Sequence, residues 1–415
     1  MTQWSPVWRV KIAGVDVTDS VLASLNITSG RTNIYEQAQA GYCSITLIVF
    51  DQVAISYQIN DSLSVEVQDT SAVYQPIFGG SIVDIAVSVS EVGSTAYTQE
   101  VTITALGALA RLQKALTDGV LTQDFDGDQI YTILSQLLFA QWQQVPAAET
   151  WAAYDPTITW ATAENVGLGE IDRPGNYELA QRSSSRIVIY DLVAALATSG
   201  LGYLYEDANG LIGYADSTHR TNYLAANGYT DLTANHALGR GITIKTRAGD
   251  VRNDLTLKYN TNSNSEVSDT DPVSIATYGD LAQIITTTIK HTADAEDQAA
   301  FYLSLRANPQ PIFDQITFAL TNPELDNGDR DSLINVFMGQ PIALNNLPLN
   351  MSAGTFQGFV EGWTFRASFN ELAVTLLLSP LAYSLQAMRW NDVPINETWA
   401  SVSPTLTWEY ATIVS

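Results

Sequence analysis

Cysteine and histidine, the side chains behind disulfides and many metal sites, are nearly absent from this sequence. Cys43 is the single cysteine, and the three histidines stand far apart at positions 219, 236 and 291. A disulfide needs two cysteines, and zinc sites and His-based triads need several such groups together. We therefore expect no disulfide framework, no thiolate metal site and no cofactor, with little material for zinc or a triad.

Basic residues are scarce as well. The chain has 19 Lys and Arg against 44 Asp and Glu, which gives a formal net charge of −25. Proteins that hold nucleic acid do so largely by neutralising phosphates with Lys and Arg. DNA should therefore not adhere to this chain.

Long apolar runs are also missing. The most apolar stretch, 372–385, is interrupted by polar residues and Pro380, and it is shorter than the about 20 apolar residues that cross a bilayer. Residues 1–20 alternate apolar and charged positions without the apolar core of a signal peptide. We expect neither a membrane span nor a secretion signal.

The motifs of common enzyme classes do not occur. There is no Gly-x-Ser-x-Gly elbow, no His-Glu-x-x-His and no Gly-x4-Gly-Lys-Ser/Thr loop, so hydrolases, zincins and P-loop enzymes have no support. Asp124, Asp126 and Asp128 alternate like the start of a calcium loop, but Ser135 stands where that loop needs Glu. A turn with an Asp126 or Asp128 helix cap is the favoured interpretation.

Period-2 alternation of apolar and polar residues is what the sequence does have. The clearest runs are 62–67 and 83–90 near the start, and 315–320 later. Further on, Phe359, Trp363 and Phe365 fall on one side of an extended chain. This period is typical of half-buried strands, so we expect antiparallel β modules in both the N-terminal and the C-terminal parts.

The middle of the chain mixes helix and strand signals. Apolar residues recur at helical spacing in 128–142 and again in 186–199. Residues 203–214 alternate around Asn209-Gly210, which is the strongest short-range signal for a β-hairpin. Residues 259–272 are rich in Asn, Ser, Asp and Thr, so we expect a long exposed loop there.

These patterns predict five segments along the chain. They are a first β module (1–114), a helix with a tryptophan arm (115–163), an α+β middle domain (164–241), a second β module containing the long loop 259–272 (242–389), and a C-terminal tryptophan arm (390–415).

The clearest internal repeat is a pair of tryptophan-rich segments, which we call the two tryptophan arms. Residues 142–163 align without gaps on 390–411, with 12 identities in 22 positions, far beyond chance for two stretches of one chain. The shared tryptophans are Trp142, Trp151, Trp160, Trp390, Trp399 and Trp408.

The tryptophan arms have two interpretations. Within an arm the rings are nine residues apart, which puts them on one face of neither a strand nor a helix. They either plug the cores of two related domains or dock on a neighbouring subunit or another protein. The second arm lies near the end of the sequence, where residues are loose unless something holds them, and this favours docking.

A weaker repeat links the two β modules. The pattern Phe-x-Gly-x-aliphatic begins at Phe78 and again at Phe356, and 61–65 is similar to 340–344. Together with the arms, it suggests two copies of one module, each leading to a tryptophan arm.

Several of these segments resemble minor tail proteins of long-tailed phages. The resemblance lies in 8–18, 27–31 and 40–47 and in the Thr-Trp pairs at 398–399 and 407–408. Those proteins are similar in turn to the baseplate hub family, whose trimers carry two tube-like β-barrel domains per chain. The resemblance implies a multidomain α+β, mainly β fold: two tube-like antiparallel β-barrel modules plus a smaller α+β insertion.

The function that this resemblance implies is a non-catalytic structural hub of a phage tail tip. Three chains with two modules each would present six similar surfaces to a hexameric tail tube, with threefold partners below. The implied partners are the chain itself as a homotrimer, the tail tube or a distal tail protein, and other tail-tip or fibre proteins. DNA would pass through without specific binding, and no membrane is involved. The chain would be located in the virion, at the tail tip, after assembly in the host cytoplasm.

Three alternatives stay open at this point. The acidity either offers DNA a lumen without adhesive contacts or only keeps a large subunit soluble. A peripheral host-receptor or carbohydrate-binding tail module would use exposed Trp and Tyr rings to stack on sugars. A wall-degrading enzyme would use a pair of the 44 acidic residues, none of which stands out.

Overall fold

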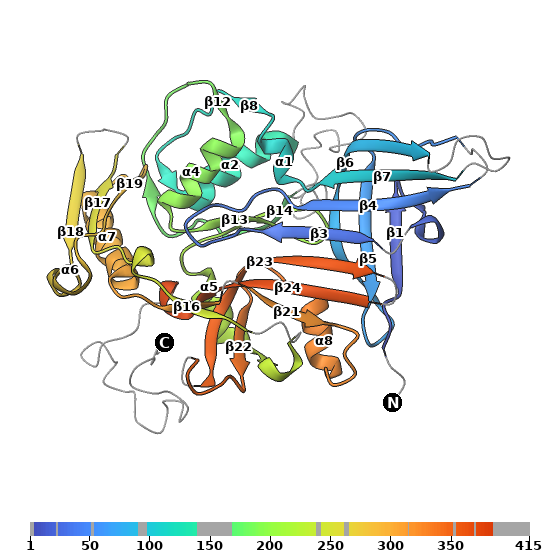
Figure 1. The fold of residues 1–415 in the computed structure, drawn as a ribbon. Helices are drawn as coiled ribbons and strands as arrows, with labels where there is room; N and C mark the ends of the chain where they lie inside the picture. The colour runs from blue at the N-terminus through green and yellow to red at the C-terminus, as the bar shows by residue number, and fades with distance from the viewer. Residues whose placement is uncertain are drawn as a thin grey trace.

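A large sheet crosses the molecule, with helices packed above it and a small sheet-and-helix unit at one side (Figure 1). This computed structural model describes residues 4–21, 24–50, 54–89, 98–138, 168–237, 242–260, 265–313, 315–351, 354–368 and 371–384.

Strands from both ends of the chain form the large sheet. Their order is β15-β22-β23-β3-β4-β7-β6-β5-β1-β2, and β24 pairs with both β23 and β21. Neighbours are antiparallel except β15 and β22, which run parallel. The bounds are β1 Trp8–Ile12, β2 Val15–Asp16, β3 Leu25–Gly30, β4 Tyr42–Val49, β5 Ser62–Gln68, β6 Tyr74–Val89, β7 Gln99–Leu106, β15 Thr230–Thr233, β21 Ile316–Ala319, β22 Pro341–Asn345, β23 Phe356–Ser368 and β24 Glu371–Pro380.

The predicted strand runs near the start and end of the chain are confirmed as strands. In β5 the alternating Leu63, Val65 and Val67 are buried, as the period-2 pattern predicts. In β6 the second half of the run departs from that pattern, because Val87 and Val89 are exposed. The sequence therefore predicts the strand there but not its burial.

The middle of the chain forms the predicted helices and hairpin. The helix predicted at 128–142 is α2 (Asp126–Leu138), and the one predicted at 186–199 is α4 (Ile189–Ser199), which packs on α2. The predicted hairpin is β13 (Tyr203–Glu206) with β14 (Ile212–Ala215), and β10 (Leu168–Ile171) adds to it in parallel.

A small α/β unit contains the segment that the sequence predicts to be a long loop. The prediction of a loop over 259–272 is wrong in part, because β18 (Glu266–Thr270) pairs with β17 (Asp254–Lys258), beside β19 (Ala282–Thr286). The polar composition suits an edge strand with an exposed face. The backbone hydrogen bonds of this strand are made with the neighbouring strand β17. The unit also contains α6 (Pro272–Tyr278) and α7 (Thr292–Arg306).

Short elements complete the described residues. They are β8 Leu116–Thr117 with β12 Ile187–Val188, β9 Asp124–Phe125 with β11 Glu178–Leu179, β16 Ile244–Thr246 with β20 Pro311–Phe313, the helices α1 Leu109–Leu112, α5 His219–Asn227 and α8 Asn327–Ile334, and the 3-10 turns η1 Thr18–Ser20, η3 Ala234–His236, η4 Ala248–Asp250 and η6 Leu381–Tyr383. None of the helices in the described ranges is long and apolar enough to cross a membrane.

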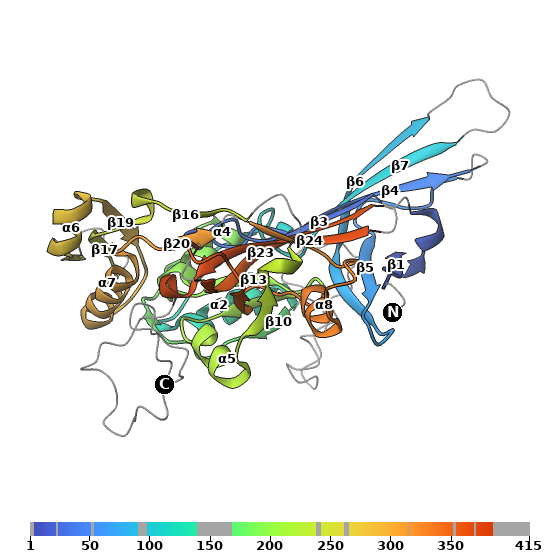
Figure 2. The same cartoon turned by 60° about the horizontal axis from the view of Figure 1, so that its bottom comes forward.

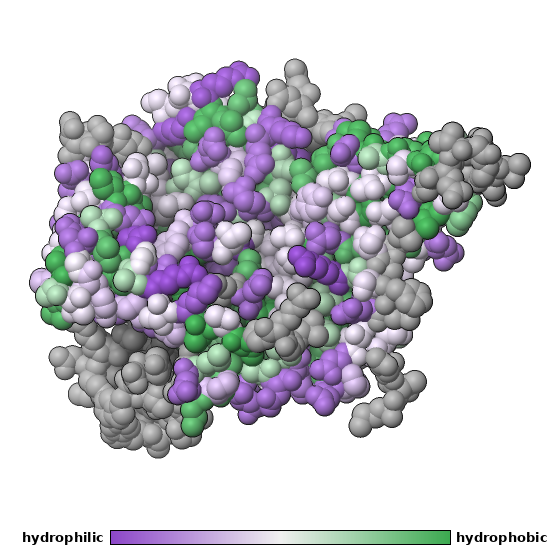
Figure 3. Space-filling view, in the orientation of Figure 1, coloured by the Kyte–Doolittle hydropathy of each residue, from purple (hydrophilic) through white to green (hydrophobic). Residues whose placement is uncertain are grey.

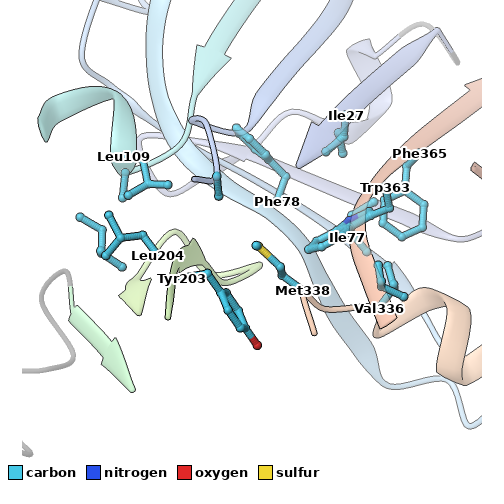
Figure 4. Close-up of a cluster of buried hydrophobic side chains, with 14 of the residues drawn as sticks. Ile27, Ile77, Phe78, Leu109, Tyr203, Leu204, Val336, Met338, Trp363 and Phe365 are labelled. Atoms are coloured by element: carbon cyan, nitrogen blue, oxygen red, sulfur yellow. The ribbon is translucent and has the colours of Figure 1, made fainter. Parts of the chain in front are cut away.

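One hydrophobic core joins segments that lie far apart in the sequence. Figure 4 shows Ile27 of β3, Phe78 of β6, Tyr203 of β13 and both Trp363 and Phe365 of β23 in the same cluster. All five side chains are buried. The fold is mainly β, built on a large antiparallel sheet, and its N-terminal and C-terminal strands share one core.

Candidate assembly interface

Two parts of the large sheet repeat the same strand pairing. We call β3–β7 the first β unit, and β16 with β20–β24 the second β unit. The hairpin β5–β6 has the register of the hairpin β22–β23, at the positions of the weaker sequence repeat. The matching pairs are Leu63–Gly80 with Ile342–Gly358, and Val65–Phe78 with Leu344–Phe356.

A β-bulge occurs at the same place in both units. In β6 the register against β7 shifts at Val83, and in β23 the register against β24 shifts at Glu361. Each bulge residue stands five positions after the matching phenylalanine, Phe78 or Phe356. Bulges are specific features of a strand rather than accidents, so their coincidence supports a true repeat.

The strand before this hairpin is repeated too. The bridge Val21–Leu47 of the first unit corresponds to the bridge Ala237–Phe318 of the second unit. In the same way, the pair Thr28–Tyr42 of β3 and β4 corresponds to the pair Ile244–Phe313 of β16 and β20. The offset along the first strand is 216 residues in both cases (237 − 21 and 244 − 28). Residues 242–246 of the second unit therefore correspond to 26–30 of the first. The small α/β unit is inserted after this strand, where the first unit has the short connection 31–41.

The two units meet within one chain along β3 and β23. Residues 362–367 of β23 pair antiparallel with β3, in a continuous ladder from Gly362–Gly30 to Ala367–Leu25. The apolar face of this ladder, including Trp363 and Phe365, is buried. We call this ladder the internal junction.

A buried ion cluster centred on Glu361 fixes the end of the internal junction. Its carboxylate accepts hydrogen bonds from Arg31 Nε at 2.6 Å and from both terminal nitrogens of Arg220 at 2.9 Å, and from the Ser379 hydroxyl. Burial alone would raise the pKa of Glu361, but the guanidinium groups of Arg220 and Arg31 outweigh it and lower that pKa to about 2. The bulge places the Glu361 carboxylate where it contacts three separate segments, through Arg31, Arg220 and Ser379.

The middle segment is attached to the first unit by another buried carboxylate. Glu206, at the end of β13, accepts hydrogen bonds from the backbone N–H groups of Gly41 and Leu109. Burial raises its pKa to about 7, although the two N–H groups act in the opposite direction. The Asn209-Gly210 turn of the same hairpin lies against Gly79 of β6, so close that a Cβ at Gly79 would clash with its backbone. The hairpin is therefore packed against the first β unit.

The far end of β6 is different, because it has a single neighbour among the strands that the structure describes. Beyond Ser81, β6 pairs only with β7 among the described strands. Figure 2 shows β6, β7 and β4 extending away from the rest of the molecule, and apolar residues are visible on this end of the sheet in Figure 3. We call residues 84–89 of β6 the open edge. An exposed strand edge with apolar side chains is a surface for assembly.

The six tryptophans singled out in the sequence lie outside the described residues, so their role as interaction residues stays a prediction. The structure brings together Arg31, Arg220 and Glu361 instead, and sequence reasoning missed all three. A signal was present: Glu361 is a lone charge between Val360 and Trp363 in an apolar strand, and such charges are rarely buried unless paired.

The acidic run at 124–128 serves the fold. The Asp126 carboxylate is buried and accepts hydrogen bonds from the backbone N–H groups of Asn176 and Tyr177 and from the Tyr214 hydroxyl. Burial raises its pKa. Asp126 therefore binds another segment of the chain with its side chain, and Asp128 pairs with Arg173 at 2.6 Å. Across the described ranges no three His, Cys, Asp or Glu side chains gather as a metal site.

Comparison by sequence finds no relative: neither a family profile nor a curated protein matches this chain. Comparison by structure does. The 43 kDa tail protein of prophage MuSo2 from Shewanella oneidensis is similar over 91% of this chain and 99% of its own, with a TM-score of 0.57 and 10% identity. The tail protein from Neisseria meningitidis MC58 is similar over 92% and 98%, with a TM-score of 0.57 and 9% identity. Prophage tail protein gp18 from Listeria monocytogenes EGD-e is similar over 90% and 95%, with a TM-score of 0.48 and 11% identity. The first two likenesses span nearly whole chains, and this protein therefore has the fold of prophage tail proteins.

Proposed function

We propose that this protein is a structural, non-catalytic hub of a phage tail tip. One observation carries the proposal: a single chain contains two β units with the same strand pairing and the same bulge. A ring of three such chains presents six similar units, which matches a hexameric tube on one side and threefold partners on the other. The shared fold with two prophage tail proteins supports a role in a tail.

In this proposal each β unit belongs to a tube-like barrel that lines a channel for DNA. The chain carries 44 acidic against 19 basic residues, so a channel made of it offers DNA few adhesive phosphate contacts. The tail tube or a distal tail protein binds the sixfold face, and other tail-tip or fibre proteins bind the threefold face.

The two tryptophan arms, in this proposal, dock on neighbouring tail proteins. Replacing Trp399 and Trp408 by Ala is expected to reduce the binding of the adjacent tail protein in a pull-down while leaving the unfolding midpoint of the free chain unchanged. A lower midpoint with unchanged binding would show that the rings fill a core instead.

The test of the hub is the mass of the purified protein by light scattering, alone and then with its tail-tube neighbour. We expect a mass of three chains, because the two units of each chain then complete a closed ring. A monomer under both conditions contradicts the hub, and would favour a peripheral receptor-binding or carbohydrate-binding tail module.

A further inference from the structure

The open edge of β6 carries a row of apolar side chains whose counterparts on β23 are buried. The counterparts, at equal distances from Phe78 and Phe356, are Ile85 with Trp363, Val87 with Phe365, and Val89 with Ala367. Phe365 and Ala367 are 1% and 8% exposed, whereas Val87 and Val89 are 51% and 42% exposed. The difference lies in the second neighbouring strand: β23 has β24 on one side and β3 on the other, whereas β7 is the single described strand that runs along 84–89.

A strand that corresponds to β3 exists in the second β unit. Residues 242–246, which include β16, match 26–30 by the offset of 216 residues, and Arg247 then stands at the position of Arg31. Among the described strands, β16 pairs with β20 alone. Among the described strands, residues 84–89 of the first unit therefore have a neighbour on one side, β7, and β16 of the second unit has a neighbour on one side, β20.

These two segments cannot meet within one chain. In both views β16 lies towards the small α/β unit, well away from the far end of β6 (Figures 1 and 2). A strand edge with unpaired backbone groups and an apolar face binds an added strand readily. Within the described residues, β3 is the strand that fits such an edge, on β23. A neighbouring copy of the chain would supply the segment that corresponds to β3, residues 242–246.

We propose that residues 84–88 of one chain pair antiparallel with residues 242–246 of a neighbouring chain, in the register of the internal junction. In that junction Trp363 lies opposite Ser29 and Phe365 opposite Ile27. The matching pairs between chains are Ile85 with Lys245 and Val87 with Thr243. This contact is head to tail, so repeated rotation closes a ring in which intramolecular and intermolecular ladders alternate. The inference rests on the proposed ring and names the residues that close it.

A cysteine pair tests the register directly. Val87→Cys and Thr243→Cys are introduced into the full chain, where both positions are exposed and the native Cys43 is buried. Residues directly opposite on antiparallel strands bring their Cβ atoms within the reach of a disulfide. After mild oxidation, a non-reducing gel should show dimers and trimers, which revert to monomers with reductant.

The control places the second cysteine at Thr246 instead, an exposed position that would lie opposite Asp84 on the other face of the ladder. Val87→Cys with Thr246→Cys should give at least tenfold less cross-linked product. Equal cross-linking of both pairs contradicts the register. If light scattering shows trimers and Val87→Cys with Thr243→Cys does not link them, the strand pairing is wrong while the hub stands. If the chain is monomeric and does not cross-link, both fail.

A second variant tests the edge without new thiols. Val87→Asp puts a charge on the row that the neighbouring strand covers, and we expect loss of the trimer at the concentration where the unchanged protein is fully assembled. Val120→Asp, at another exposed valine, should assemble normally. At a concentration where all three proteins are monomeric, the unfolding midpoints of both variants should match the parent. An assembled Val87→Asp protein would overturn the inference.

Discussion

At the scale of single residues, buried charge decides how the segments are joined. Glu361 holds two guanidinium groups at the internal junction, and Glu206 holds two backbone N–H groups between the first unit and the middle segment. Each carboxylate joins segments that are distant in sequence, so the role of each can be tested by one substitution.

Glu361→Ala should lower the free energy of unfolding by about 3–5 kcal/mol, because it leaves Arg31 and Arg220 buried without their shared partner. Urea unfolding followed by fluorescence measures this. Glu324→Gln, at an exposed position, should change the same quantity by less than about 0.5 kcal/mol. Similar small effects from both substitutions would mean that the cluster does not stabilise the junction.

Glu206 should make stability depend on pH. Its pKa is about 7 in the folded protein against the ordinary 4.5, so the folded state binds the extra proton between these values and stability falls as pH rises through that window. At about 1.36 kcal/mol per pKa unit, the loss amounts to about 3 kcal/mol between pH 4.5 and 7. Unfolding titrations at pH 5 and 8 should show this fall in the parent protein and a smaller one in Glu206→Gln. Parallel pH profiles would contradict the assignment.

At the scale of elements, the hairpin β13–β14 packs closely against the strand β6. The turn of β13–β14 presses on β6 at Gly79, far from the residues that a hairpin pattern describes. The alternation around Asn209-Gly210 predicts the hairpin because turn chemistry is local. What the turn packs on depends on the path of the whole chain.

Gly79→Ala should therefore destabilise the protein by about 1–3 kcal/mol, because the added methyl group would overlap the backbone of Asn209. Gly249→Ala is the matched control, since a Cβ there meets nothing within 4 Å. The midpoint of thermal unfolding should fall for the first variant alone. An unchanged midpoint for Gly79→Ala would mean that the hairpin is free to move away from β6.

At the scale of the whole molecule, net charge decides whether DNA binds. The net charge of −25 predicts that the purified protein does not retard duplex DNA in a gel at 50 mM salt or at 200 mM salt. A shift at low salt that disappears at high salt would reveal a basic surface and contradict a channel without adhesive contacts. A basic tail protein run in the same gel serves as the positive control.

The sequence by itself determines several of the strands, the helices α2 and α4, and the repeat, whereas the longest described helix, α7, is not predicted. Period-2 runs such as 62–67, the helical spacing in 186–199 and the matched Phe-x-Gly patterns are local, and local patterns reflect which face of an element is buried. The same reasoning fails over 259–272, where a polar segment becomes β18 because β17 supplies its hydrogen bonds.

Only the tertiary structure decides which strands become neighbours. The alternation in 83–90 looks the same as in a buried strand, yet 84–89 is an open edge while its counterpart on β23 is covered by β3. The burial of β23 depends on β3, a segment more than 300 positions away in the sequence, and the ion pair of Glu361 with Arg31 spans the same separation. Pairing over such separations is set by the packing of the whole chain, and for the open edge, in our proposal, by the packing of a second one.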